Sequence, residues 1–253
     1  MFKPILKILH PVYLVWAYLT FVAGLLVIFP VVLFTLLLGQ PAAGNIVIKL
    51  CRYWSDAWLF CIGIRHRNIE ESPIDPNRHY VFVANHISYL DIPLIFQGIR
   101  KNSIRVLGKM EMSKIPVFGV VYRLAVVLID RSSQTIRGKS IQRLLQVLNQ
   151  NISIFIFPEG TFNETGHPLK HFYDGAFKIA IETQTPIKPI VFLDAVERFH
   201  YKSIFSITPG KSRCVILPEI PVEGYTPHDV AALKNATFEA MKACIEKYGG
   251  HYK

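Results

Sequence analysis

A histidine and an aspartate stand five positions apart in the segment Asn85–Asp91, directly after the apolar run Tyr80–Ala84. The run is predicted to be a strand, and open α/β sheets place their sites at the carboxyl ends of strands. Across a strand-to-helix turn, Asp91 can bond one ring nitrogen of His86 and leave the other free to take a proton from a hydroxyl. Alone, this spacing occurs often by chance and favours a plain polar turn, with Asp91 at a helix start before Pro93. Other motifs must decide.

Two further polar clusters follow predicted strands. Phe157-Pro158-Glu159-Gly160-Thr161 comes at the end of the run Ile152–Phe157, and Asp130-Arg131 follows the run Ala125–Ile129. With the His86 turn they make three polar clusters that we expect at one edge of one sheet. This convergence favours a catalytic site over a polar turn.

Two other patterns resemble functional sites, but the residues around them argue against a site. His167 and His171 stand four apart, but Gly166 and Pro168 mark their stretch as a loop, so we expect no metal site there. Ser88 stands beside His86 without a Gly-x-Ser-x-Gly elbow, which disfavours a serine hydrolase and favours activation of a hydroxyl on the substrate.

The elements that must position these residues follow from the pattern of apolar side chains. From His79 onward, β-rich runs alternate with helical stripes, which predicts an α/β sheet covered by helices. Stripes within 141–148 and 172–181 predict two of those helices. The last helix should begin with Thr226 as N-cap and Pro227 at its first position, and end at Tyr248. The predicted strands are Tyr80–Ala84, Ile104–Leu107, Ala125–Ile129, Ile152–Phe157, Ile187–Leu193 and Arg213–Leu217.

The N-terminal segment predicts a membrane anchor, residues 1–44, followed by one catalytic domain, residues 45–253. No charged side chain occurs between Pro11 and Ile48, and Val12–Leu38 is almost wholly apolar. As a helix this stretch would be roughly 40 Å long at about 1.5 Å per residue, longer than the roughly 30 Å hydrocarbon core. Pro30 lies inside it, so a kinked span and a re-entrant hairpin turning near Pro30 are both consistent with the sequence.

The next segment, residues 45–64, is predicted to be an amphipathic helix. It is either an interfacial helix with its apolar side chains facing lipid, or an ordinary surface helix. The side chains expected to face lipid in the first case are Trp54, Trp58, Leu59 and Ile62.

Composition points to a membrane surface as the partner. The chain of 253 residues has 28 Lys and Arg against 18 Asp and Glu, a formal charge of +10, and 51% hydrophobic residues. An anionic partner is therefore expected, and because no nucleic-acid-binding signature occurs, we expect lipid and not nucleic acid. The four cysteines form no CxxC pair, which fits a reducing compartment. Basic residues flanking the apolar segment place the main domain on the cytoplasmic side.

In the order and spacing of its motifs, over residues 45–215, the chain resembles the glycerolipid acyltransferase family, most closely the 1-acylglycerol-3-phosphate acyltransferases. Asn85-His86 through Asp91 resembles the first block of the family, Gly119 through Asp130-Arg131 the second, and Phe157 to Thr161 the third. Thr185-Pro186-Ile187 through Val191 resembles the apolar fourth block. The resemblance implies a mixed central sheet flanked by helices.

The resemblance also implies roles. His86 would deprotonate the acceptor hydroxyl, which attacks a thioester directly, and Asp91 would orient His86. The acyl donor would be acyl-CoA or an acyl carrier protein, the acceptor lysophosphatidic acid, and no cofactor would be needed. The residues that it implies for substrate binding are Asn85, Lys109, Arg131, Phe157, Pro158, Glu159, Gly160 and Thr161, with Arg131 and Lys109 as phosphate contacts and Lys109 assigned by position alone.

One departure bears on the acceptor. The third block of the family usually continues with an Arg after the Thr, whereas this chain has Phe162. Phosphate recognition would then fall to Arg131, Lys109 or Lys170, or the acceptor carries no phosphomonoester, as in an amino-acid-containing lyso-lipid. A non-catalytic lipid-binding protein is the alternative from another class, and the intact His86 and Asp91 argue against it.

Overall fold

The computed structural model describes residues 3–129 and 134–252. Within them the chain forms one mixed seven-stranded sheet in the order β1-β7-β6-β2-β5-β3-β4. Each predicted strand is present with its ends shifted by a few residues at most, and β1, which the sequence pattern did not predict, is added at the edge. The strands are β1 Ile64–Glu70, β2 Val81–Ala84, β3 Ile104–Lys109, β4 Val126–Ile129, β5 Ser153–Ile156, β6 Ile187–Phe192 and β7 Gly210–Ile216.

Strand direction brings the ends of five strands to one edge. β2 pairs in parallel with β5 and β6, and β3 pairs in parallel with β5 and β4. β7 runs antiparallel to β6, and β1 runs parallel to β7, which makes the sheet mixed. The carboxyl ends of β2, β5, β6, β3 and β4 therefore lie at the same edge, as the polar clusters required.

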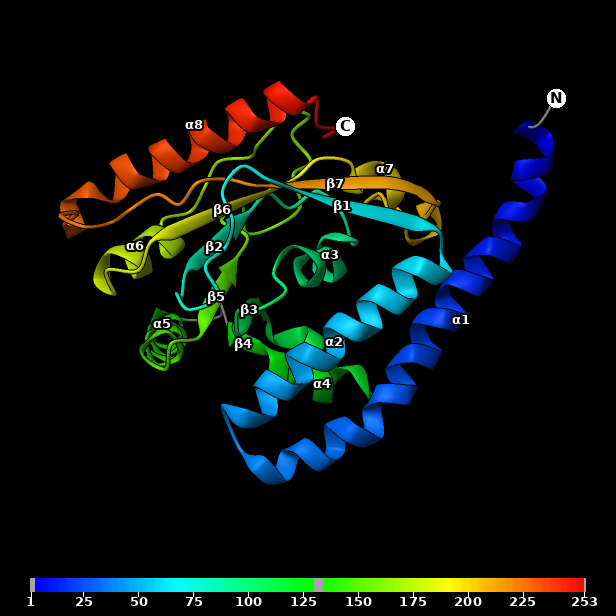
Figure 1. Ribbon diagram of the computed structural model, residues 1–253, viewed down its shortest axis with the longest axis horizontal. Helices are drawn as coiled ribbons and strands as arrows, with labels where there is room; N and C mark the ends of the chain where they lie inside the picture. The colour runs from blue at the N-terminus through cyan, green and yellow to red at the C-terminus, as the bar shows by residue number, and fades with distance from the viewer. Residues whose placement is uncertain (1–2, 130–133, 253) are drawn as a thin grey trace.

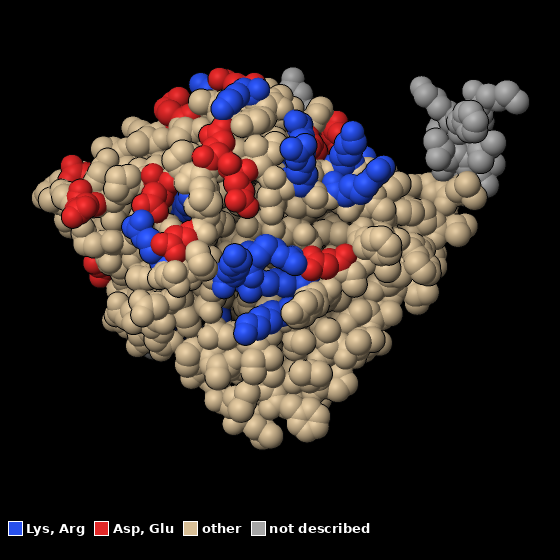
Figure 2. Space-filling view, viewed as in Figure 1, with Lys and Arg blue, Asp and Glu red and all other residues tan. Residues whose placement is uncertain are grey.

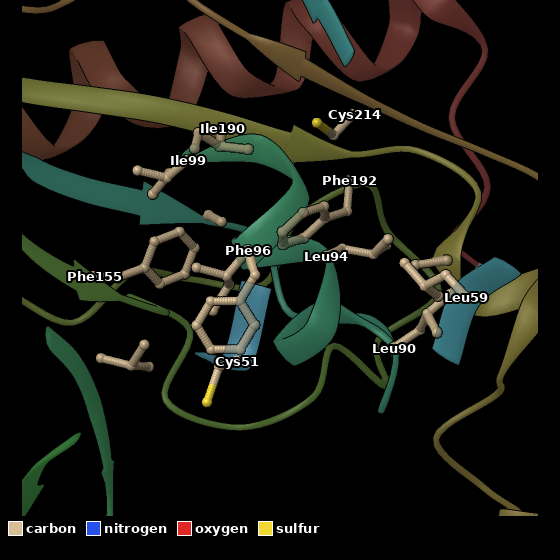
Figure 3. Packing of buried hydrophobic residues seen from close by; sticks show 14 of the residues in the cluster. Cys51, Leu59, Leu90, Leu94, Phe96, Ile99, Phe155, Ile190, Phe192 and Cys214 are labelled. Atoms are coloured by element: carbon tan, nitrogen blue, oxygen red, sulfur yellow. The ribbon is translucent and has the colours of Figure 1, made fainter. Parts of the chain in front are cut away.

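Helices cover both faces of the sheet (Figure 1). One face carries α5 Gln134–Asn149, α6 Gly175–Glu182 and α8 Val230–Tyr248, and the other carries α2 Ala42–Cys61, α3 Asp91–Gly98 and α4 Phe118–Ala125. Figure 3 shows the core on the second face, where Leu94 and Phe96 of α3 pack with Phe155 and Phe192 of the sheet. Burying such side chains stabilises the fold by about 1.5–3 kcal/mol each, so α3 is held firmly against the strands.

The predicted helices are present. Leu144 and Leu148 of α5 are buried, as is the stripe of α6, although Phe172 packs just before that helix begins. Thr226 forms a capping box with Asp229 on the short 3-10 turn η4 Pro227–Asp229, from which α8 continues to Tyr248.

The apolar N-terminus forms one continuous helix, α1 Lys3–Thr35, extended by a 3-10 turn, η1 Leu36–Leu38. Pro30 lies inside α1, whose ribbon bends in Figure 1, and the chain reverses only after η1. The chain therefore does not turn near Pro30, because the helix continues for another turn beyond that proline, and the choice between a kinked span and a re-entrant hairpin stays a prediction. In the described residues, the stretch Leu9–Leu38 is the one helical segment long and apolar enough to cross a membrane.

α2 returns along α1, and its apolar side chains are used in that packing. Trp58, Leu59 and Ile62 are buried, and Trp54 stacks on Trp58 against Phe21 of α1. The alternative in which these four side chains face lipid is wrong, because Trp58, Leu59 and Ile62 are buried and Trp54 packs on Phe21 of α1. The indole N–H of Trp58 donates to the carbonyl of Ala17 at 2.9 Å, which fixes the two helices together. The division into 1–44 and 45–253 stays a prediction.

Arg105, a buried residue of β3, holds the α1–α2 turn against the sheet. Its Nη2 donates to the carbonyl of Pro41 at 2.9 Å, and its Nη1 to Oδ1 of Asn45 at 3.0 Å. The hairpin is thus bonded to the domain at its turn as well as along its length.

Candidate active site

The turn after β2 carries the histidine. β2 is fully buried and ends at Ala84, so Asn85 and His86 lie at the carboxyl edge of the sheet. The amide of Asn85 donates from Nδ2 to the carbonyl of Phe192 at 2.9 Å and accepts from the Phe192 N–H at 2.8 Å. This paired bond ties the end of β2 to the end of β6. The contact with substrate expected for Asn85 stays a prediction, since both ends of its amide serve the turn.

His86 and Asp91 form the expected pair. Nδ1 of His86 lies 2.8 Å from Oδ2 of Asp91, and the same oxygen accepts the backbone N–H of Ile87 at 2.7 Å and of Ser88 at 2.9 Å. Three donors on one carboxylate oxygen fix its position, and with it the ring. Nδ1 must therefore carry the proton, and Nε2 is left with its lone pair, the state that a general base requires.

Burial differs sharply between the two partners. The side chain of Asp91 is fully buried, whereas that of His86 is 17% exposed. Burial raises the pKa of Asp91, and its bonds to His86 and to the backbone N–H groups of Ser88 and Ile87 oppose that rise. Among the described residues no partner reaches Oδ1 of Asp91. The pair thus has one enclosed end, which positions the ring, and one end open to a ligand.

Ser88 is part of the turn and offers no nucleophile. Its Oγ is fully buried, donates to the carbonyl of Phe199 at 2.5 Å and accepts from the N–H of Leu90 at 2.9 Å. A hydroxyl that is enclosed and bonded in this way cannot attack a substrate carbonyl. The geometry therefore supports the expectation that the reacting hydroxyl belongs to the substrate.

The loop after β5 lies against the His86 turn, and Glu159 joins them. Oε1 of this fully buried carboxylate accepts the N–H of His86 at 3.1 Å, and Oε2 accepts the N–H of Lys170 at 3.3 Å. Desolvation by burial raises the pKa of Glu159 to about 8. Gly160 follows with φ of 73°, a left-handed conformation that other residues adopt at a cost. Glu159 thus fixes the backbone at His86 relative to the loop at Lys170.

Aromatic rings surround the imidazole. Phe157 stacks on His86 with ring centroids 4.0 Å apart, and Phe162 lies at 4.2 Å, tilted by 47°. Tyr89 and Tyr201 in turn pack on Phe162 at 5.0 and 5.8 Å. Phe162, which stands where the family usually has Arg, therefore packs against the imidazole and supplies no positive charge for a headgroup.

Cations lie around the third block and beside it. Nζ of Lys170 donates to Oγ1 of the exposed Thr161 at 2.7 Å, next to Phe162. Lys109 is exposed at the end of β3, two strands from β2 in the sheet, or about 10 Å at the usual strand spacing. Asp130 and Arg131 lie outside the described residues, but β4 ends at Ile129 opposite Lys109.

The remaining predicted residues shape the loop. Pro158 is buried, and its carbonyl accepts the N–H of Tyr173 at 2.9 Å. The stretch with His167 and His171 is a loop, as predicted, and in the described residues no three His, Cys, Asp or Glu side chains are grouped to hold a metal ion.

Sequence reasoning missed two features of the site. The N–H of the buried Asn163 donates to the carbonyl of His86 at 2.7 Å, and its side chain holds the loop to His167. Tyr89, from the same turn as His86, and Tyr201, from far along the chain, join the aromatic cluster. Tyr89 stands within the first block, three positions after His86, whereas nothing in the sequence indicated Tyr201.

This arrangement can remove a proton from a bound hydroxyl. His86 is partly exposed and in contact with Phe157 and Phe162, its Nε2 carries the lone pair, and Asp91 would stabilise the imidazolium formed after proton transfer. No protein nucleophile is required, because the hydroxyl that Nε2 activates belongs to the substrate. Direct transfer of a group to a substrate hydroxyl is the chemistry that this geometry supports.

The comparisons agree with this chemistry. A human 1-acyl-sn-glycerol-3-phosphate acyltransferase alpha is 33% identical over 189 residues, which cover 73% of this chain and 64% of the human protein. A 1-acyl-sn-glycerol-3-phosphate acyltransferase of Haemophilus influenzae is 31% identical over 189 residues, 74% of this chain and 76% of its own. The matched part thus spans less than two thirds of the human relative.

A solved structure shares the fold. The crystal structure of the 1-acyl-sn-glycerophosphate (LPA) acyltransferase PlsC from Thermotoga maritima superposes with a TM-score of 0.77, over 98% of this chain and 99% of that one, at 22% identity. The coverage includes the N-terminal hairpin as well as the sheet. The family model described as Acyltransferase matches residues 63–193, just over half of the chain, with the His86 turn and the Glu159 loop inside them, and the chain belongs to this acyltransferase family.

Proposed function

We propose that this protein transfers a fatty-acyl chain from a thioester donor to the free hydroxyl of lysophosphatidic acid, giving phosphatidic acid. The observation that carries the proposal is the His86–Asp91 pair, 2.8 Å apart, with Nε2 of His86 left to act as base and no nucleophile at Ser88. The relatives named 1-acyl-sn-glycerol-3-phosphate acyltransferase support the same acceptor.

The reaction balances with this one base. Nε2 of His86 takes the proton of the acceptor hydroxyl as its oxygen attacks the thioester carbonyl carbon. The tetrahedral intermediate collapses, the C–S bond breaks, and the proton on Nε2 passes to the departing sulfur. Asp91 keeps Nδ1 protonated throughout and stabilises the imidazolium between the two transfers. Acyl-CoA and an acyl carrier protein both supply the required thioester, and neither step needs a cofactor.

The acceptor phosphate needs compensating cations, since a phosphomonoester carries nearly two negative charges. Position 162 supplies none, because Phe162 packs on His86 and Tyr201. We assign the headgroup contact to Lys170, whose Nζ is held at Thr161 beside Phe162, with Lys109, at the end of β3, and Arg131 as further contacts. Glu159 joins His86 to Lys170 through its two oxygens, which would fix the spacing between base and headgroup.

A second acceptor class is favoured by the same Phe162. An aromatic wall without a fixed guanidinium suits a lyso-lipid with no phosphomonoester, such as an amino-acid-containing one. Replacing Lys170 by a neutral residue should therefore weaken turnover of the acceptor with a phosphomonoester and leave the phosphate-free acceptor unaffected.

Membrane association accompanies this function. On α1 an apolar stripe is exposed: Val12, Val15, Trp16, Leu19, Val22 and Leu26. Figure 2 shows that the lower part of this face of the molecule, where α1 and α2 meet, carries no Lys, Arg, Asp or Glu, while charges lie over the domain above. Since the opposite face of α1 packs on α2, we propose that the hairpin lies in one leaflet, with the domain on the cytoplasmic face.

The test is an acyl-transfer assay on the purified full-length chain with a panel of lyso-lipid acceptors and both donor types. We expect turnover of lysophosphatidic acid to phosphatidic acid. Turnover of an amino-acid lyso-lipid, with none of lysophosphatidic acid, would replace the acceptor and keep the mechanism. If the thioester donor is not consumed and no acylated product forms with any acceptor, the proposed function is wrong.

A further inference from the structure

The segment Phe199–Ile207 connects the catalytic turn with the N-terminal helix. At its start, the carbonyl of Phe199 accepts a hydrogen bond from the hydroxyl of Ser88 at 2.5 Å. The ring of Tyr201 stacks on Phe162, which itself contacts His86. The segment is therefore bonded directly to the residues that hold the base.

The other end of the same segment is bonded to α1. The hydroxyl of Tyr18 donates to the carbonyl of Ile204, and Nε2 of His10 lies 3.1 Å from the carbonyl of Ile207. These two α1 residues are eight positions apart, about two helical turns, so both lie on one side of that helix. The segment runs along this side of α1.

Between these contacts, two apolar side chains face outward. Ile204 is 50% exposed and Phe205 is 65% exposed, on the short 3-10 turn η3 Ile204–Ser206. The turn is well fixed, because Oγ of Ser203 accepts the N–H of Phe205 at 3.1 Å and Oγ of Ser206 donates to the carbonyl of Ser203 at 2.7 Å. Two large apolar side chains on such a fixed turn give up little conformational freedom when a partner covers them.

Helix geometry places this turn beside the exposed stripe of α1. At about 100° per residue, the stripe centred on Leu19 lies about 100° around the helix from Tyr18, which contacts η3. On the other flank, the indole of Trp16 donates to the carbonyl of Cys61 at 2.9 Å, near Phe60 of α2, which is 84% exposed. The apolar surface thus continues from α2 across α1 to η3.

We propose that Ile204 and Phe205 enter the same bilayer leaflet as α1, so that η3 forms a lipid-contacting lip between the membrane and the catalytic turn. This inference rests on the membrane association proposed above. The exposed Lys202 on the same segment suits anionic headgroups at the lipid surface. Because Phe199 is bonded to Ser88 and Tyr201 packs on Phe162, the lip places the lipid surface close to the catalytic turn.

The experiment measures the environment of position 205 directly. In a full-length Cys61→Ser background, Phe205→Cys is labelled with an environment-sensitive fluorophore, since Cys51, Cys214 and Cys244 are buried and Cys61 is the exposed thiol. The matched control is Glu239→Cys, exposed on α8 across the sheet from α1. Vesicles contain phosphatidylcholine and phosphatidylglycerol, with and without a nitroxide on the acyl chain.

We expect the label at position 205 to brighten on binding vesicles and to be quenched by the acyl-chain nitroxide, while the label at position 239 does neither. Ile204→Asn with Phe205→Gln should weaken vesicle partitioning by about tenfold, with Glu239→Gln unchanged. A chain that sediments with vesicles while position 205 shows no response overturns this inference alone. A chain that acylates dispersed lysophosphatidic acid but does not bind vesicles overturns the membrane association and leaves the acyl transfer standing.

Discussion

Replacing Asp91 by Asn tests how the base is held. The amide oxygen can still accept the N–H groups of Ile87 and Ser88, which lie 2.7 and 2.9 Å from Oδ2, so the turn should keep its shape. The amide carries no charge, however, and its NH2 group would occupy the place of Oδ1, where no partner is found among the described residues. The change removes the charge that stabilises the imidazolium and adds a buried donor without an acceptor.

The magnitude follows from the geometry. Two opposite charges a few ångströms apart interact by about 4 kcal/mol at an effective dielectric constant of about 20. That energy is lost only when His86 carries the proton, so kcat should fall by about 100- to 1,000-fold, at about 1.4 kcal/mol per factor of ten. The orphaned NH2 should lower the free energy of unfolding by about 1–3 kcal/mol.

The assay is steady-state acyl transfer to lysophosphatidic acid, with thermal unfolding followed on the same samples. Ser88→Ala serves as the control, because it removes a buried hydroxyl of the same turn without touching the pair; kcat of the folded fraction should change by a few-fold at most. An Asp91→Asn enzyme whose kcat stays within about threefold of the parent would refute the role of the carboxylate.

Three further predictions follow. Lys170→Gln should raise KM for lysophosphatidic acid by about tenfold, since a charge-assisted contact contributes about 1.5–3 kcal/mol, and should leave a phosphate-free acceptor unaffected; equal loss on both acceptors would mean that Lys170 only supports the loop. Burial raises the pKa of Glu159 to about 8, above its ordinary 4.5, so between these pH values the folded state binds a proton that the unfolded state has lost. The free energy of unfolding should therefore fall as the pH rises from 5 to 8. In Glu159→Gln, denaturant titrations should show a weaker dependence of this free energy on pH, and an unchanged dependence would contradict the assignment. Trp58→Ala should cost about 3–5 kcal/mol of unfolding free energy, while Phe60→Ala, which removes an exposed ring of the same helix, should cost little; similar losses would show that α1 does not pack on α2 as described.

The sequence predicted the pairing of His86 with Asp91 because the two residues are close in the chain. His86 and Asp91 belong to one turn after a fully buried strand, so their meeting depends on local geometry alone. The convergence of that turn with the Glu159 loop followed from parallel strands ending at one edge. Six of the seven strands were predicted from their apolar runs, whereas β1 was missed because its sequence, Ile64–Glu70, is largely polar and lies at an edge.

The features that sequence reasoning missed depend on long-range packing. Trp54 and Trp58 form an apolar face that suits lipid and protein equally, and only the return of the chain after η1 decides that α1 covers it. For Pro30 the sequence was consistent with both a kinked span and a hairpin turn, because a helix in an apolar surrounding can continue through a proline with a bend, as α1 does. Tyr201 reaches Phe162 across almost forty positions, which no local pattern indicates.

The role of His86 as the base for acyl transfer is tested by kcat of a folded His86→Ala enzyme with lysophosphatidic acid and acyl-CoA. The ring contacts Phe157 and Phe162 but is partly exposed, so the variant should still fold, as circular dichroism and thermal unfolding can establish. We expect a loss of about 100- to 10,000-fold in kcat, the usual contribution of a general base. A folded His86→Ala protein that forms phosphatidic acid at a near-normal rate would contradict this role.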